Sequence, residues 1–212
     1  MLAGGLVSLL FRRGDEVLLY KLLADASFFE LLLKIDMERA EEARRDGCPA
    51  CRGTLHVANY LRKPRGAAIE LGIEQARRFS LCCGAEGCRR RMTPPSVRFL
   101  GRRVYLALMV VVAGVLLHGV TSRRVAVLSR ELEVSRQTVE RWRAWWRDEF
   151  SASSTFKAAR GWLMPVPDTA ALPASLIDCF VGDERERMLA CLKLLCPLST
   201  TSCAARARDH AV

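Results

Sequence analysis

The chain has 212 residues, half of them apolar, and a formal net charge of +10 at neutral pH. This length holds one medium-sized domain or two small ones, and the apolar fraction permits a packed core. The sequence contains no internal repeat and no long low-complexity run, which excludes a repeat architecture and a compositionally biased chain.

Positive charge is concentrated in one part of the sequence. Residues 84–147 contain 13 arginines and four glutamates, a net charge of +9, whereas the residues before them sum to +2 and those after them to −1. Every basic residue in this span is arginine, whose guanidinium can bind phosphate or guanine through two hydrogen bonds. An ordinary solubilising surface would not need such segregation, so we expect a polyanionic partner, namely a nucleic acid.

The nine cysteines point to a metal rather than to disulfides. Their number is odd, and the first residues, MLAGGLVSLLFRR, lack both a basic region before the apolar stretch and a small-residue cleavage site. Export is therefore unsupported, and we expect a cytoplasmic protein. In a reducing compartment, paired cysteines indicate metal binding sooner than disulfide formation.

Residues 1–46 are predicted to be a helical N-terminal segment, with a helix from Asp25 onward. A solvated charged end follows the apolar part of this helix, and Gly47 is expected to stop it. The prediction rests on apolar residues that recur at helical spacing, which are Phe28, Leu31, Leu32 and Ile35.

Residues 47–103 are predicted to form a small β zinc ribbon. Strands are expected at Thr54–Tyr60 and Arg78–Cys83, around a basic loop at Arg62–Gly66 whose proline and glycine break regular structure. After the adjacent prolines at 94 and 95, a further strand can pair at Ser96–Leu100.

Four cysteines in this segment have the spacing of metal ligands. CPAC places two thiolates on a tight turn whose backbone amides can point at sulfur, and LCCGAEGC supplies a second pair from a distant turn. In that second pair Cys83 is preferred to Cys82, because Leu81 and Cys83 share a strand face by period-two alternation. The predicted ligands are Cys48, Cys51, Cys83 and Cys88.

Four sulfur ligands with no water-activating histidine or glutamate nearby predict a structural Zn²⁺ rather than a catalytic one. His56 can replace one sulfur ligand, and an iron–sulfur site is an alternative. A redox dithiol at CPAC is less favoured, because no βαβ pattern surrounds it. The other widely spaced cysteines are expected to be buried small hydrophobic residues, namely Cys179, Cys191, Cys196 and Cys203.

Residues 104–150 are predicted to be a three-helix unit. Val104–Val120 is apolar and near the lower limit for a membrane span, but its two glycines, His118 and the arginines on both sides favour a buried helix. In RRVAVLSRELEVSRQTVERWRAWWRDEF, two further helices are separated by a short turn, and Ser135 caps the second. The residues expected to face inward are Leu128, Leu132, Val134, Val139 and Trp142.

This order of small and apolar positions resembles the DNA-binding helix-turn-helix family. Ser129 stands where a small residue permits close helix contact, and Glu133 stands where that family favours glycine at the turn. Side chains that project away from the inward face near the start of the second helix are expected to read base edges or reach phosphate. They are Arg136, Gln137, Glu140, Arg141 and Arg143.

Arginines that precede the three-helix unit are expected to neutralise backbone phosphates, which provides affinity without sequence information. They are Arg89, Arg90, Arg91, Arg98, Arg102 and Arg103.

A paired-cysteine knuckle, a second knuckle, the arginine-rich RRRMTPPSVRFLGRR and a helix-turn-helix follow one another over about residues 47–150. This order resembles the zinc-ribbon plus helix-turn-helix DNA-binding regions of bacterial insertion-element transposases and of the small proteins encoded beside them. The resemblance implies a targeting head for element ends. Catalysis in full transposases comes from three acidic residues on an RNase-H-like domain, and the 62 residues after Phe150 are too few for it. We therefore expect a transposition-associated or truncated transposase-like binding component and no enzyme.

Residues 151–212 are expected to be an irregular C-terminal tail. It begins with a polar linker at Ser151–Thr155 and contains one amphipathic helix near Glu184–Leu195. The expected fold is thus mainly α with a small β zinc ribbon. A transposase or a second copy of the chain is a further expected partner, and a small-molecule substrate is not expected. The alternatives are a membrane-associated or redox protein, and an adaptor that binds another protein.

Overall fold

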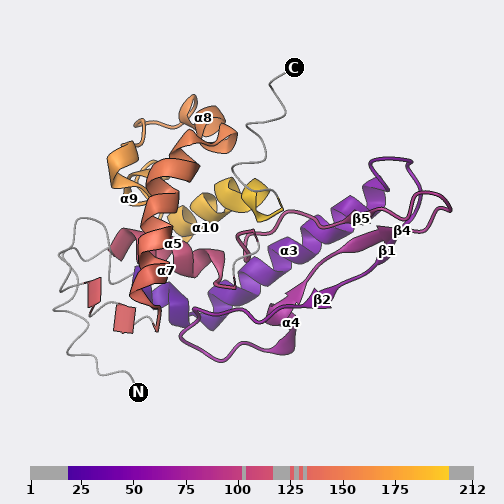
Figure 1. Cartoon of the computed structure of the whole chain (residues 1–212), viewed down its shortest axis with the longest axis horizontal. Helices are drawn as coiled ribbons and strands as arrows, with labels where there is room; N and C mark the ends of the chain where they lie inside the picture. Colours follow the sequence, from indigo (N-terminus) through magenta and orange to yellow (C-terminus); the bar gives the residue numbers. More distant parts are fainter. Residues whose placement is uncertain (1–18, 102–103, 117–124, 127–128, 131–132, 201–212) are drawn as a thin grey trace.

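The computed structural model of the chain describes residues 19–101, 104–116, 125–126, 129–130 and 133–200 (Figure 1). It is mainly helical with small antiparallel sheets, as predicted. The short helix η1 (Leu22–Ala24) leads into α3 (Ala26–Asp46), the longest helix described. The Asp25 side chain accepts a hydrogen bond from the backbone N–H of Phe28, and α3 ends at Gly47, whose φ is +75°. The helix predicted from Asp25 to Gly47 is therefore confirmed.

Strands follow α3 in two small sheets. The first has the order β1 (Leu55–Val57), β4 (Leu81–Cys83) and β5 (Arg91–Met92), all antiparallel. The second pairs β2 (Tyr60–Leu61) with β3 (Arg77–Arg78), with the one-turn helix α4 (Ile73–Ala76) directly before β3. We refer to residues 47–57 and 80–92 as the arm, because they run beside the C-terminal half of α3 to one end of the molecule's long axis (Figure 1).

The strand expected at Ser96–Leu100 does not form. Phe99 makes only an isolated bridge to Leu106, and the third strand of the sheet is β5 instead. The reason lies in the hydrogen bonds of this segment. The backbone N–H of Ser96 donates to Ser199 Oγ and that of Val97 donates to Asp36 Oδ1, so side chains take the place of a strand partner.

The remaining helices form the helical body around α5 (Ala107–Leu116), all ten of whose residues are buried. Next come α7 (Arg136–Ala144), the π-helical turn η2 (Trp145–Phe150), α8 (Ser154–Arg160) and η3 (Thr169–Ala171). They are followed by α9 (Ala174–Ile177), α10 (Glu184–Leu195) and η4 (Cys196–Ser199). In the part of the chain that the structure describes, no helix combines the length and the apolar character needed to cross a membrane.

The C-terminal region is more ordered than expected. The polar linker predicted at Ser151–Thr155 contains the start of α8, because the Ser153 side chain accepts a hydrogen bond from Phe156 N and so caps that helix. Phe156 is then buried in the main core, together with residues of α9, α10 and η4. The helix predicted near Glu184–Leu195 is present with those bounds, and it begins with a capping box between Asp183 and Glu186.

The body and the arm occupy opposite ends of the long axis. Helix α7 lies at one end of the molecule and the sheet of β1, β4 and β5 lies at the other, with α3 running between them (Figure 1). The main core contains residues of α3, α5, α7 and every later helix from η2 to η4 except η3. A separate small core in the arm contains only Cys48, Leu55, Leu81 and Cys83.

Candidate metal centre and basic surfaces

The four cysteines predicted as ligands come together at the end of the arm. Their Sγ atoms all lie within 4.8 Å of one another. Cys48 Sγ is 3.7 Å from Cys88 Sγ, and Cys51 Sγ is 3.5 Å from Cys83 Sγ. Four thiolates arranged tetrahedrally around an ion at about 2.3 Å would be separated by about 3.8 Å. The cluster therefore has the size and the donor set of a four-sulfur metal site.

Local structure explains why these sulfurs converge. The CPAC turn closes through a hydrogen bond from Cys48 N to Gly53 O, and the second knuckle closes through one from Cys88 N to Ala85 O. The antiparallel register of β1 and β4 pairs Leu55 with Cys83, which brings the second knuckle beside the first. A Cβ on Gly53 would lie 3.3 Å from the Sγ atoms of both Cys51 and Cys83, so glycine leaves the sulfurs room to approach.

The thiols of the cluster differ in acidity. Backbone N–H groups of Ala50 and Cys51 point at Cys48 and lower the pKa of its thiol to about 6. The amide of Ala85 lowers the pKa of Cys83, but burial and the neighbouring thiols outweigh it and raise that pKa to about 12. Four sulfurs this close cannot all ionise without a compensating cation, because each thiolate opposes the next. A positive ion at the centre of the cluster would let all four sulfurs ionise, so the cluster could hold a metal ion.

The open choice between Cys82 and Cys83 is resolved by the strand alternation. Cys83 is buried in the cluster, whereas the Cys82 thiol donates weak hydrogen bonds to the carbonyl oxygens of Cys83 and Arg89. His56 is exposed and is not a member of the cluster. None of the described cysteines forms a disulfide, and Cys191 and Cys196 are buried as expected, while Cys179 is half-buried. Cys203 lies outside the described residues.

Helix α7 presents a polar face and is fixed by an apolar one. The Ser135 side chain accepts a hydrogen bond from Thr138 N at the start of the helix, as a cap should. Val134, Val139 and Trp142 are buried, in agreement with their predicted inward positions. The five residues predicted to face DNA are all exposed, namely Arg136, Gln137, Glu140, Arg141 and Arg143.

The turn before α7 uses a left-handed residue. Glu133 has φ +52°, at the position where the resemblance places glycine. Its backbone N–H donates to Arg130 O, and that of Val134 donates to Ser129 O, the pair of bonds that closes a helix through a left-handed residue. Leu128 and Leu132, predicted to face inward just before this turn, lie outside the described residues.

The arginines predicted to contact phosphate lie at the exposed arm, in the interior of the protein, or outside the described residues. Arg89, Arg90 and Arg91 are exposed at the arm, next to the cysteine cluster. Arg91 is already engaged, because its guanidinium donates to Ser80 Oγ and to Ala58 O. Arg102 and Arg103 lie outside the described residues.

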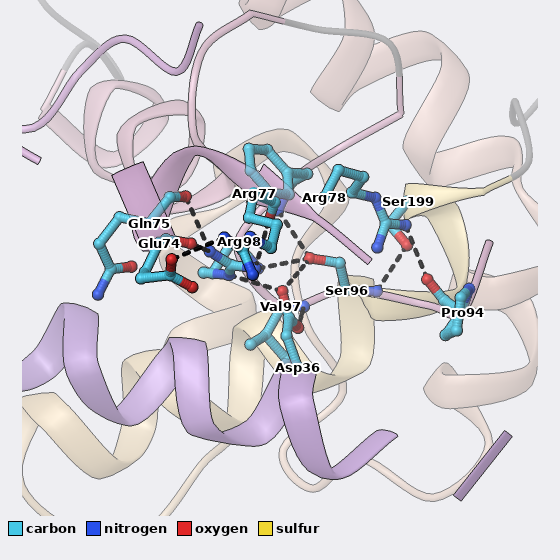
Figure 2. Close-up of polar contacts among 11 residues, drawn as sticks. Asp36, Glu74, Gln75, Arg77, Arg78, Pro94, Ser96, Val97, Arg98 and Ser199 are labelled. Atoms are coloured by element: carbon cyan, nitrogen blue, oxygen red, sulfur yellow. Dashed lines mark hydrogen bonds and ion pairs between the residues drawn. The ribbon is translucent and has the colours of Figure 1, made fainter. Parts of the chain in front are cut away.

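Arg98 is buried, and the phosphate contact predicted for it is corrected to a structural role. Its side chain is 1 % exposed, and Nε is 2.8 Å from Asp36 Oδ2 (Figure 2). The guanidinium also donates to the carbonyl oxygens of Glu74, Gln75 and Arg77. Burial lowers the pKa of Arg98, and the Asp36 carboxylate opposes that shift. Arg98 therefore joins α3 to the α4–β3 segment and has no surface to offer DNA.

Sequence reasoning missed Asp36. The signal that could have found it is its position on the inward stripe of α3, where Phe29, Leu32 and Ala40 are also buried. A carboxylate on an apolar stripe needs a buried cation, and a nearby arginine is the expected partner.

Comparison of the chain with protein-family models, with curated proteins and with solved structures finds no match.

Proposed function

We propose that this chain binds double-stranded DNA through the exposed face of α7, and that the cysteine cluster holds a structural Zn²⁺ that stiffens the arm. The observation that carries the DNA proposal is the arrangement of α7. Its buried residues pack the helix against α5, and its exposed residues are polar, with three arginines, Gln137 and Glu140 among them. Arg and Gln near a helix start suit guanine and adenine edges in the major groove.

Zinc is the metal that the donor set favours. Four thiolates with no open position are typical of structural zinc sites, and the arm has too small an apolar core to fold on its own. An iron–sulfur centre is the alternative for the same ligands, and visible absorbance of the purified protein would reveal it. A redox role for CPAC is disfavoured because Cys48, the thiol with the lowered pKa, is only 1 % exposed.

In this proposal the exposed arginines of α7 and those of the arm have different roles. Arg136 is paired with Glu140 at 2.9 Å, and Arg141 donates to Thr138, so these side chains are ordered along the helix before DNA arrives. Arg89 and Arg90 directly precede β5, which lies at the far end of the molecule from α7 (Figure 1), so they would meet phosphates of a separate stretch of duplex. The arm then adds affinity, and α7 adds selectivity.

A transposition-associated role stays part of the proposal through the resemblance of residues 47–150. In that role the chain would bind element ends as a DNA-binding component. A protein-binding adaptor is the second candidate, and one observation favours it. Val57, Leu61 and Ile73 are each more than half exposed near the strands, which is apolar surface that a protein partner would cover.

Duplex binding is tested by fluorescence anisotropy with labelled DNA. Affinity should fall steeply between about 50 and 200 mM salt, because released counterions drive phosphate-mediated binding. The double variant Arg136→Gln/Arg141→Gln should bind about 10- to 100-fold more weakly, since a good base contact provides about 1–3 kcal/mol of discrimination. Lys157→Gln/Arg160→Gln on α8 removes the same charge from exposed positions and should bind like the wild type. Equal binding by both double variants would favour the adaptor.

The metal is tested by elemental analysis of the purified protein. One zinc per chain is expected, and Cys48→Ser should lose it. Cys82→Ser is the matched control, because Cys82 adjoins a ligand but lies outside the cluster and should leave the zinc content unchanged.

A further inference from the structure

The basic loop between β2 and α4 lies beside the turn that precedes α7. Ligand-binding cavities measure about 300–1,000 Å³, and the cavity between the loop and this turn measures about 780 Å³. Its lining includes Lys63 and Arg65 of the loop, Tyr105 just before α5, Met109 in α5, and Glu133 of the turn. The loop is far from α7 in the sequence, and the sequence assigns it no role.

The loop is held firmly against α5. Arg65 N donates to Val104 O and Leu106 N donates to Arg65 O, which together form a parallel bridge to Tyr105. Gly66 has φ +96°, and a Cβ there would lie only 2.4 Å from Met109 Cγ. Backbone bonds and a close glycine contact thus fix the path of the loop.

Further contacts connect the loop to α7 through its bridge partner Tyr105, and to the segment that precedes α5. The rings of Tyr105 and Trp142 meet edge to face, with centroids 5.0 Å apart, and Trp142 belongs to the buried face of α7. At the opposite end of the loop the Arg62 guanidinium donates to Gly101 O and lies 4.9 Å from the centre of the Phe99 ring. The exposed side chains of Lys63 and Arg65 are therefore presented at a fixed position relative to α7.

A helix that enters the major groove has phosphates on both sides. The groove is about 12 Å wide, and a helix with its side chains is about 10–12 Å across. Cations next to the start of such a helix consequently lie near one of the two backbones. The start of α7 is also its positive end, since unpaired N–H groups and the helix dipole favour an anion there.

We propose that Lys63 and Arg65 form a second phosphate-binding element that contacts the duplex backbone beside the groove entered by α7. This inference rests on the proposed function and extends it to a loop outside the helix pair. Glu133 lines the same cavity and opposes the anion, so its carboxylate limits the affinity.

The test is the salt dependence of duplex binding by the full chain. Lys63→Gln/Arg65→Gln should lower the slope of log affinity against log salt by about 1.8, which is two phosphates at roughly 0.9 each. The affinity should fall by the same factor for duplexes of different sequence, because phosphate contacts read no bases. The two side chains are exposed, so the melting temperature should stay that of the wild type. Lys157→Gln/Arg160→Gln, which removes the same charge elsewhere, should leave the slope unchanged.

Glu133→Gln provides a test in the opposite direction. Removing this carboxylate should strengthen duplex binding by about two- to fivefold at low salt, in line with the worth of an exposed charge pair. A wild-type slope in Lys63→Gln/Arg65→Gln, with normal duplex binding by the parent, would overturn the loop inference and leave the proposed function standing. Absence of salt-dependent duplex binding by the parent protein would overturn the proposed function itself. Tighter binding of single-stranded RNA than of duplex would overturn the assignment of the loop's ligand.

Discussion

The main core, which joins the helical body to the N-terminal half of α3, has 38 buried apolar residues among those the structure describes, whereas the core of the arm has four, two of which are cysteine. Burying two leucines contributes about 3–6 kcal/mol, at about 1.5–3 kcal/mol each. Ordering a residue costs about 1–2 kcal/mol of backbone entropy, so two leucines cannot fix a segment of this length. The body is stabilised by apolar burial, and in the proposed function a metal ion held by the four thiols stabilises the arm.

Removal of the metal should therefore have the largest effect, and only on the arm. Structural zinc sites contribute on the order of 10 kcal/mol at neutral pH, far more than the apolar contacts of the arm. In chelator, or in Cys48→Ser, the backbone amides of Ala58 and Cys83 should lose protection from hydrogen exchange, since both bond within the arm sheet or at its edge. Amides of α5 should stay protected. Protection of Cys83 in metal-free protein would show that the strands hold without the ion.

The second largest effect should come from Asp36→Ala, at the junction of the two regions. This substitution leaves the buried Arg98 without its carboxylate, and breaking a buried pair in this way costs about 3–5 kcal/mol. The free energy of unfolding from urea titration measures it. Asp148→Ala is the matched control, because Asp148 pairs with Arg147 at the surface and should cost less than about 1 kcal/mol. Equal losses in the two variants would contradict the structural role of Asp36.

Asp25→Ala should have a smaller effect on the body. Loss of this cap should lower the free energy of unfolding by about 1 kcal/mol, and Asp46→Ala at the other end of α3 should not. Burial raises the pKa of Asp25, but hydrogen bonds from Ser27 and Phe28 and the charge of Arg185 outweigh it and lower that pKa overall. The ionised Asp25 therefore adds to the free energy of unfolding above its unfolded-state pKa, and this stabilisation is lost as the pH falls through the lower folded-state pKa. Urea titrations at neutral and acid pH should show that the free energies of unfolding of the wild type and of Asp25→Ala become equal in acid.

The smallest predicted effect is a gain. Glu133→Gly should raise the free energy of unfolding by about 0.5–1 kcal/mol, because glycine adopts the left-handed conformation without steric cost. Glu140→Gly in the middle of α7 should instead lower it by about 1 kcal/mol. A loss of stability in both variants would mean that the Glu133 side chain contributes more than its backbone conformation costs.

Features set by local pattern could be predicted from the sequence. The helix from Asp25 to Gly47, the choice of Cys83 over Cys82 and the inward residues of α7 follow from periodicity and capping, which depend on neighbours a few residues away. The burial of Arg98 depends on Asp36, which is 62 residues distant. Its place in an arginine-rich run predicted a surface position, and nothing local distinguishes it from its exposed neighbours.

The remaining differences have the same origin. Ser96–Leu100 has strand-like alternation, but its backbone groups bond to side chains from α3 and η4, two elements that the sequence does not link to it. Polar residues at 151–155 resemble a linker, but the Ser153 side chain caps α8 and Phe156 is buried in the main core. Long-range packing decides the hydrogen bonds of Ser96–Leu100 and the burial of Phe156, whereas the Ser153 cap is a local contact with a residue three positions later.

Helix α3 sets the span between the two ends of the molecule. Its 21 residues extend about 30 Å, with the N-terminal half in the main core and Ala43 against the small core of the arm. Each residue inserted into or deleted from its middle would move the cysteine cluster by about 1.5 Å and turn it by about 100° about the helix axis. At about 3.6 residues per turn, only an insertion or deletion close to a whole number of turns would keep the cluster facing the same way. If the chain binds DNA as proposed, the length of α3 fixes the distance and the angle between the arginines of the arm and those of α7 on the duplex.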